Sequence, residues 1–130
     1  MKKIFLSVAL LAVVGLVSCK NEAKKDNAQT ETTNTLATTD ISFGVRGNCA
    51  MCKMTIEKAA NSVEGVTSAN WDVKKKKIAI SFDASKTNVM AVHNAIADSG
   101  YDTDKKKRNQ ENYTNLPGCC QYSSKMEMNQ

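Results

Sequence analysis

The sequence predicts an α+β fold in which two helices cover one face of an antiparallel sheet. Two periodicities predict it. Apolar residues alternate with polar ones in three stretches, as in half-buried strands, and recur every three or four residues in two others, as in amphipathic helices. Their order, with one short strand added at the end, is that of a ferredoxin-like βαββαβ sandwich. The expected strands are 41–45, 66–73, 78–82 and 101–103, and the expected helices are 50–62 and 88–98.

The first strand and the first helix meet at a short junction. Gly47 and Asn48 break the strand, whose apolar residues alternate over 41–45. Over 50–62 the apolar residues share one helix face, and Gly65 is a suitable helix stop. The residues expected to face the core are Ile41, Phe43, Val45, Cys52, Ile56, Ala59, Ala60 and Val63.

The remaining elements follow the same rules. Residues 66–73 and 78–82 are expected strands on either side of a lysine turn, 74–77, and apolar residues alternate over 69–73 and 78–82. Thr87 is the candidate N-cap of the second helix. The last strand, 101–103, lacks the alternation, so its regularity stays open. The inward residues are expected to be Ala69, Trp71, Val73, Ile78, Ile80, Phe82, Val89, Val92 and Ile96.

The start of the chain has the pattern of an export signal. Lys2 and Lys3 precede an apolar run that is too short to span a membrane comfortably. The run ends in Leu-Val-Ser-Cys at 16–19, which resembles the lipobox of bacterial lipoproteins and implies that Cys19 carries lipid. An ordinary cleaved signal is the alternative. We therefore expect an exported protein of the cell envelope, anchored to a membrane by lipid and facing the periplasm or the cell surface.

This pattern divides the chain into four parts. The signal peptide is 1–18, and the polar segment 19–40 is a flexible linker, because it cannot bury enough apolar area to offset the entropy of ordering. The folded domain is expected at 41–104. The polar tail, 105–130, carries a pair of cysteines, and its last stretch, 123–130, is expected to be disordered.

Composition argues against several classes of function. The formal net charge is +5, but aromatic residues make up only 5% and do not interleave with the basic clusters, so nucleic acid is not an expected partner. The sequence contains no Ser-His-Asp grouping, paired catalytic carboxylates or phosphate-binding glycine loop, so an enzyme is not expected.

His93 is expected to pack in the fold or to lie on the surface, and Glu57 is expected to be solvated. The chain is expected to be a monomer.

Five cysteines stand out in an exported chain. Cys19 is assigned to lipid, and the other four form two close pairs, Cys49 with Cys52 and Cys119 with Cys120. Such pairs stabilise a fold poorly as disulfides, because they close only tiny loops. Metal or redox chemistry suits them better.

The first pair is expected where the first helix begins. Unpaired backbone N–H groups and the helix dipole favour thiolate there, and Lys53 adds a positive charge beside Cys49 and Cys52. Two soft sulfurs suit Cu(I) and other thiophilic ions such as Ag(I). A site of low coordination number also suits transfer, because a partner's thiolate can attack the ion. The alternative is a thiol-disulfide oxidoreductase using the same pair.

Several separated motifs agree in order and spacing: Gly47-Asn48-Cys49-Ala50-Met51-Cys52, Ile56 with Glu57, Val63-Glu64-Gly65-Val66, and Ser99-Gly100-Tyr101-Asp102. Together they resemble the heavy-metal-associated domain family, which includes copper chaperones, copper-transporting P-type ATPases and mercury carriers. The resemblance covers 41–103 and implies that Cys49 and Cys52 are the metal ligands. It also implies a cargo of Cu(I), with Hg(II), Zn(II) and Cd(II) as alternatives, and a metal-transporting ATPase or efflux component as partner.

Two residues near the pair are interpreted through this resemblance. Copper-binding members usually have a methionine, pointing into the core and supporting the loop, where this chain has Gly47. Tyr101 falls where bacterial members often have a tyrosine near the metal loop. It is expected either to cover the metal or to fill the core.

The tail pair lies outside the resemblance to the domain. If the tail returns to the first pair, Cys119 and Cys120 would supply a third or fourth sulfur and shift the preference toward zinc, cadmium or mercury. The alternatives are a disulfide to another thiol or cysteines without a role.

Overall fold

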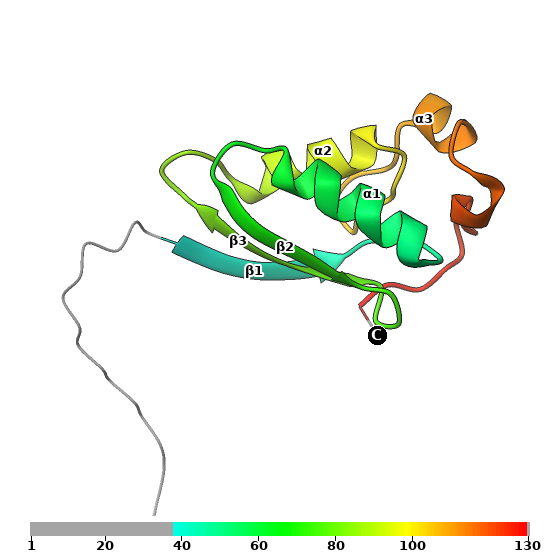
Figure 1. Ribbon diagram of the computed structural model, residues 1–130, viewed down its shortest axis with the longest axis horizontal. Coiled ribbons are helices and arrows are strands. Elements are labelled where there is room, and N and C mark those ends of the chain that lie inside the picture. Colours follow the sequence, from blue (N-terminus) through cyan, green and yellow to red (C-terminus); the bar gives the residue numbers. More distant parts are fainter. Residues whose placement is uncertain (1–37, 130) are drawn as a thin grey trace, which may run out of the picture. The chain divides into compact units, whose positions relative to one another are not determined.

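The computed structural model describes residues 38–129, which contain three strands and two long helices, then a short helix and a 3-10 turn (Figure 1). The predicted signal peptide 1–18, the lipidation site Cys19 and most of the linker 19–40 lie outside the described residues. In chain order the elements are β1 (Thr38–Gly44), α1 (Ala50–Asn61), β2 (Val66–Asp72), β3 (Lys77–Asp83), α2 (Val89–Asp98), α3 (Gln110–Thr114) and η1 (Gly118–Cys120).

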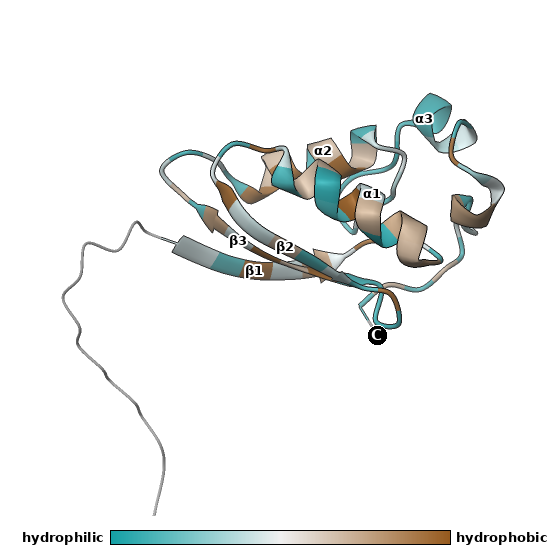
Figure 2. Ribbon diagram, viewed as in Figure 1, coloured by the Kyte–Doolittle hydropathy of each residue, from teal (hydrophilic) through white to brown (hydrophobic). Residues whose placement is uncertain are grey.

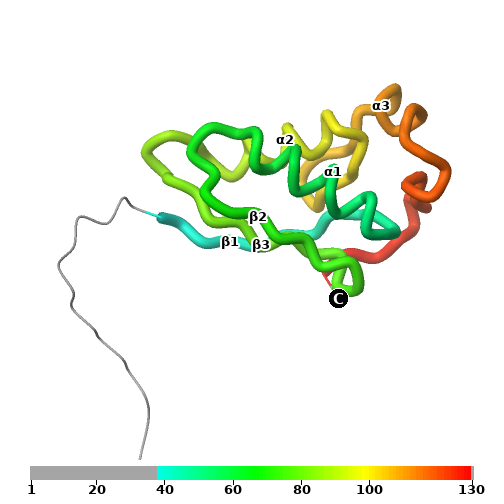
Figure 3. The backbone as a smooth tube through the Cα atoms, viewed as in Figure 1, coloured from blue at the N-terminus to red at the C-terminus, as the bar shows by residue number. Residues whose placement is uncertain are grey.

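The three strands form one antiparallel sheet with β3 in the middle, in the order β1-β3-β2. Ile80 of β3 lies opposite Ile41 of β1 and Ala69 of β2, so the alternating apolar residues of all three strands share one face. Helices α1 and α2 lie side by side over that face (Figures 1 and 3). This arrangement confirms the predicted α+β, ferredoxin-like class.

The fourth expected strand, 101–103, is reduced to a single bridge between Val45 and Thr103. The Thr103 amide donates a hydrogen bond to the Lys106 carbonyl oxygen over 2.9 Å, so the chain turns where a strand would have continued. The carboxylate of Asp102 is bonded to Arg46 over 3.1 Å. Polar side chains that bind locally therefore replace the apolar alternation that a regular strand needs.

The core lies between the helices and the sheet. Figure 2 shows apolar stretches on the strands and on α1 and α2, whereas α3 is largely polar. The second helix begins one residue later than expected: the side chain of Asn88, and not that of Thr87, accepts a hydrogen bond from the Ala91 amide over 3.1 Å. The fully buried side chains include Val45, Cys52, Ile56, Trp71, Ile78, Val92, Ile96 and Tyr101.

The segment after residue 104 packs back onto the domain. Tyr122 is buried, and its hydroxyl accepts a hydrogen bond from the Asp102 amide over 2.6 Å and donates to the Gly100 carbonyl oxygen over 3.2 Å. The expected disorder of the last stretch is not what the described part, 123–129, shows: the carbonyl oxygen of Met126 accepts a hydrogen bond from Arg46 Nε over 2.6 Å. The core thus extends beyond the expected domain 41–104.

Candidate metal centre

The Cys49-Cys52 pair lies at the junction of β1 and α1. Cys49 is the N-cap of α1 in an extended backbone conformation, and its carbonyl oxygen accepts the first helical bond, from the Lys53 amide, over 3.1 Å. Cys52, in the first turn, is fully buried, whereas Cys49 is partly exposed. The two Sγ atoms are 3.6 Å apart, so one ion can contact both sulfurs.

The backbone around the pair favours thiolate. The backbone N–H of Cys52, opposed by desolvation and helped by the Cys52 thiol and the Met51 N–H, lowers the pKa of the Cys49 thiol to about 7. The Asn48 amide donates a hydrogen bond to the Cys52 Sγ over 3.2 Å. At pH 7 about half of the Cys49 thiol is therefore ionised.

Trp71 supports the loop from the core side. Its indole packs against Gly47, and its Nε1 donates a hydrogen bond to the Val45 carbonyl oxygen over 3.1 Å. The support expected from a methionine at residue 47 is therefore supplied by a ring from β2.

Lys53 and Glu57 attach α1 to β2. The Lys53 ammonium donates to Glu57 Oε1 over 2.6 Å, to Asn70 Oδ1 over 2.9 Å and to the Trp71 carbonyl oxygen over 2.7 Å. Glu57 Oε1 also accepts from the Trp71 amide over 2.7 Å, so its expected solvation is wrong. The Lys53 ammonium, which was expected to act on the cysteine pair, instead makes its hydrogen bonds at this contact between α1 and β2.

The tail brings Cys119 and Cys120 to the same loop. The Sγ atoms of Cys49, Cys119 and Cys120 all lie within 4.8 Å of one another, and none of the described cysteines is in a disulfide. Burial, together with the neighbouring Cys52 thiol, raises the pKa of the Cys120 thiol to about 12. Three sulfurs of the described chain thus lie together, and Cys52 adjoins this group through Cys49.

Asn48 holds the tail there, and sequence reasoning treated it only as a strand breaker. Its Nδ2 donates hydrogen bonds to the carbonyl oxygens of Cys119 over 3.2 Å and Gln121 over 3.3 Å. The only sequence signal was an amide side chain directly before the first cysteine.

Tyr101 and His93 have different positions relative to the sulfurs. Tyr101 is fully buried, and burial, with the nearby Cys52 and Cys120 thiols, raises the pKa of its hydroxyl. That hydroxyl has no hydrogen-bond partner within the described residues. His93 packs on Phe43, with ring centroids 3.8 Å apart, and its Nδ1 is 2.8 Å from Thr103 Oγ1. It is not part of the sulfur cluster.

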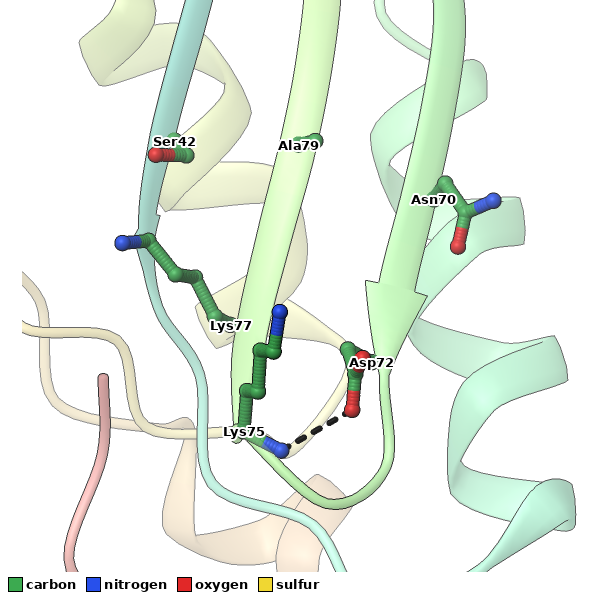
Figure 4. A pocket seen from close by; sticks show the side chains of 6 residues that line it. All are labelled: Ser42, Asn70, Asp72, Lys75, Lys77 and Ala79. Carbon is green, nitrogen blue, oxygen red and sulfur yellow. Dashed lines mark hydrogen bonds between the residues drawn. The ribbon is translucent and has the colours of Figure 1, made fainter. Parts of the chain in front are cut away.

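A hollow of about 460 Å³ lies on the sheet face away from the helices, and its lining differs from that of the cysteine cluster (Figure 4). Its rim includes Asp72, which accepts a hydrogen bond from the Lys75 amide over 2.9 Å. It is lined by Ser42, Asn70, Asp72, Lys75, Lys77 and Ala79, without a thiol or an imidazole.

Within residues 38–129, no helix has the length and apolar character needed to cross a membrane.

Comparison with known proteins places these features in a family. The model of the heavy-metal-associated domain matches residues 47–102. The chain is 35% identical over 108 residues to the "Mercuric transport protein periplasmic component" of Shigella flexneri, covering 82% of this chain and 100% of that protein. The solved structure of oxidized MerP from Ralstonia metallidurans CH34 is 33% identical, covers 52% of this chain and 96% of its own, and has a TM-score of 0.50.

A second solved structure with a TM-score of 0.50 is the water-soluble region of the P-type ATPase CopA from Bacillus subtilis. It is 28% identical, and the match covers 53% of this chain and 46% of that one. The family match contains the cysteine pair and the residues that support it, and the periplasmic relative is covered over its whole length. The chain therefore belongs to the heavy-metal-associated domain family of metal-binding proteins.

Proposed function

We propose that Cys49 and Cys52 bind one soft metal ion, Cu(I) by preference, and pass it to a partner protein at the cell envelope. The observation that carries the proposal is the 3.6 Å separation of the two sulfurs at a helix N-terminus, where the pKa of the Cys49 thiol is about 7. Soft thiolates select thiophilic ions. The partial exposure of Cys49 leaves a route by which a partner's thiolate reaches the ion.

Hg(II) is the second candidate cargo. It is favoured by a specific observation: the relative with 35% identity is named as a mercuric transport component. Hg(II) and Ag(I) share with Cu(I) the preference for sulfur ligands. Competition between Cu(I) and Hg(II) for the same protein separates the two candidates.

The location and the partner belong to the same proposal. We infer that 1–18 direct export and that Cys19 carries the lipid anchor, on the sequence pattern and on the periplasmic name of the relative. Similarity to the water-soluble region of a P-type ATPase favours a metal-transporting ATPase as the partner that gives or receives the ion.

Anaerobic titration of the reduced full chain with Cu(I), Hg(II) and Zn(II) tests this function. All proteins carry Cys19→Ser, so that the metal meets only the four described thiols. We expect one tightly bound ion per chain, and loss of tight Cu(I) binding in Cys49→Ser/Cys52→Ser. Unchanged stoichiometry and affinity in that variant would overturn the proposal. Turnover of a disulfide substrate by the metal-free protein would favour the oxidoreductase alternative instead.

A further inference from the structure

The tail sulfurs are held at the metal loop by a set of contacts on both sides of η1. Asn48 Nδ2 bonds the carbonyl oxygens of Cys119 and Gln121. The Gln121 side chain in turn donates to the carbonyl oxygens of Thr114 over 3.2 Å and Leu116 over 3.0 Å. These bonds fix the backbone on which both thiols stand.

A second anchor follows directly after the pair. The buried Tyr122 ring stacks on Tyr101, with centroids 5.9 Å apart, and meets the edge of Tyr113 at 5.2 Å. The Tyr113 hydroxyl donates to the Tyr122 carbonyl oxygen over 2.7 Å. Because aromatic side chains bury large areas, the return of the tail is a packed part of the fold.

The sulfur separation within each pair is close to that of tetrahedral ligands, and Cys49 joins the two pairs, because its Sγ lies within 4.8 Å of both tail sulfurs. At a metal–sulfur distance of about 2.3 Å, tetrahedral ligands lie about 3.8 Å from one another, whereas two linear ligands lie about 4.6 Å apart. The Cys49 and Cys52 sulfurs are 3.6 Å apart, and the Cys119 and Cys120 sulfurs are 3.9 Å apart. Both pairs are therefore close to the tetrahedral value before any ion is bound.

The Tyr101 hydroxyl is a second, independent pointer to a ligand. It is fully buried beside Cys52 and Cys120 and lacks a hydrogen-bond partner within the described residues. A buried donor without a partner costs free energy. Metal-bound thiolates would offer it an acceptor, and the hydrogen bond would offset part of the negative charge on the sulfurs.

We propose that Cys119 and Cys120 join Cys49 and Cys52 in one closed four-sulfur site for a thiophilic divalent ion: Hg(II), Cd(II) or Zn(II). The inference rests on the proposed function, because it uses the same first pair. In this state the tail covers the ion, and the ion is transferred only after the Asn48 contacts to the tail have opened. The tail pair thus sets which ions are retained, while the first pair alone suffices for Cu(I).

Cd(II) is the probe that tests this site, added at one equivalent to the reduced full chain carrying Cys19→Ser. X-ray absorption counts the sulfur neighbours of the ion, and competition with a chelator gives its affinity. We expect four sulfurs in the parent and two in Cys119→Ser/Cys120→Ser, with an affinity for Cd(II) at least about tenfold lower and Cu(I) binding retained. Two sulfurs in both proteins would overturn the tail site and leave the first pair intact.

Two further measurements keep the result interpretable. Circular dichroism of the metal-free proteins shows whether Cys119→Ser/Cys120→Ser is folded. If it is not, Asn48→Ala decides, since it keeps all four thiols but removes both side-chain bonds to the tail. We expect Cd(II) to dissociate at least about tenfold faster from this variant, and an unchanged rate would contradict the proposal. No Cd(II) or Cu(I) binding by the parent would instead refute the proposed function itself.

Discussion

The indole ring of Trp71 packs directly on Gly47: a Cβ atom at residue 47 would lie 2.9 Å from the indole Cη2 and 3.1 Å from Cys52 Cβ. The Trp71 ring thus occupies the space that a side chain at residue 47 would need. A family member with methionine at this place must fill the same space differently.

Gly47→Met is therefore expected to destabilise this protein, although methionine is usual at that position in the copper-binding members that the sequence resembles. Overpacking of this kind costs about 1–3 kcal/mol. Urea unfolding of the reduced, metal-free protein measures the loss. Gly118→Ala is the control, because within residues 38–129 no heavy atom other than those of its chain neighbours lies within 4 Å of the added Cβ. Equal stability of Gly47→Met and the parent would contradict the packing argument.

Glu57 is expected to contribute to stability through its two hydrogen bonds to Lys53 and Trp71. Glu57→Ala leaves the Trp71 amide without an acceptor, at a cost of about 1–3 kcal/mol. Glu57→Gln, which keeps an acceptor oxygen, is expected to lose less. Denaturant unfolding compares both with Glu64→Ala, which removes an exposed carboxylate next to the end of the same helix. A similar effect of Glu57→Ala and Glu64→Ala would refute this role.

Cys49 is expected to react with iodoacetamide at lower pH than an ordinary cysteine. The pKa of its thiol is about 7, and only the thiolate attacks, so the alkylation rate of the metal-free protein rises through about pH 7. Burial raises the pKa of Cys120 to about 12, so Cys120 is expected to stay unmodified over the same range. Mass spectrometry locates the modified residues. In the urea-unfolded control, the alkylation rates of both cysteines should rise alike, with a midpoint near pH 8.5. If the rate for Cys49 in the folded protein had the same midpoint, the loop would not stabilise its thiolate.

Acidification is expected to destabilise the fold through His93. Burial lowers the pKa of the His93 imidazole. The negative charge of Asp104 acts in the opposite direction, and the positive charge of Lys105 lowers the pKa further. The unfolded chain therefore binds a proton at a pH where the folded chain does not, and stability falls as the pH drops below about 6.5. The slope is at most about 1.4 kcal/mol per pH unit.

Urea unfolding between pH 7.5 and 5.5, compared with His93→Gln, isolates this contribution. The variant is expected to lose less stability over the interval, because it removes the titrating group while other acidic and basic groups titrate as before. An identical pH dependence in the two proteins would exclude His93 as the cause.

Periodicity was sufficient for the main architecture and insufficient for the tail. Over 41–45, 50–62, 69–73 and 78–82 the apolar residues lie on one face of each element, so their spacing contains the information needed. The irregularity of β2 between Val66 and Ser68 is not part of that pattern. The fourth strand, 101–103, failed as a regular element because Asp102 and Thr103 bind local polar partners. Such bonds depend on tertiary neighbours that spacing does not reveal.

The tail is held on the domain by a few apolar residues that do not recur at a regular spacing along the sequence. Tyr113, Leu116, Tyr122 and Met126 pack against the core from a mostly polar segment. The two tyrosines in that segment were the available signal. The cysteine pair Cys49 and Cys52 was identifiable because its spacing and its place at a helix start are local properties.

The anchored C-terminal segment decides how a working fragment of this protein should be cut. Asn129 lies beside the turn between β2 and β3 (Figure 1). Its amide donates a hydrogen bond to the Lys76 carbonyl oxygen over 3.4 Å. A fragment limited to the family match, 47–102, would discard β1, Tyr122 and two thiols. A working fragment therefore starts before Thr38 and keeps the chain through residue 129.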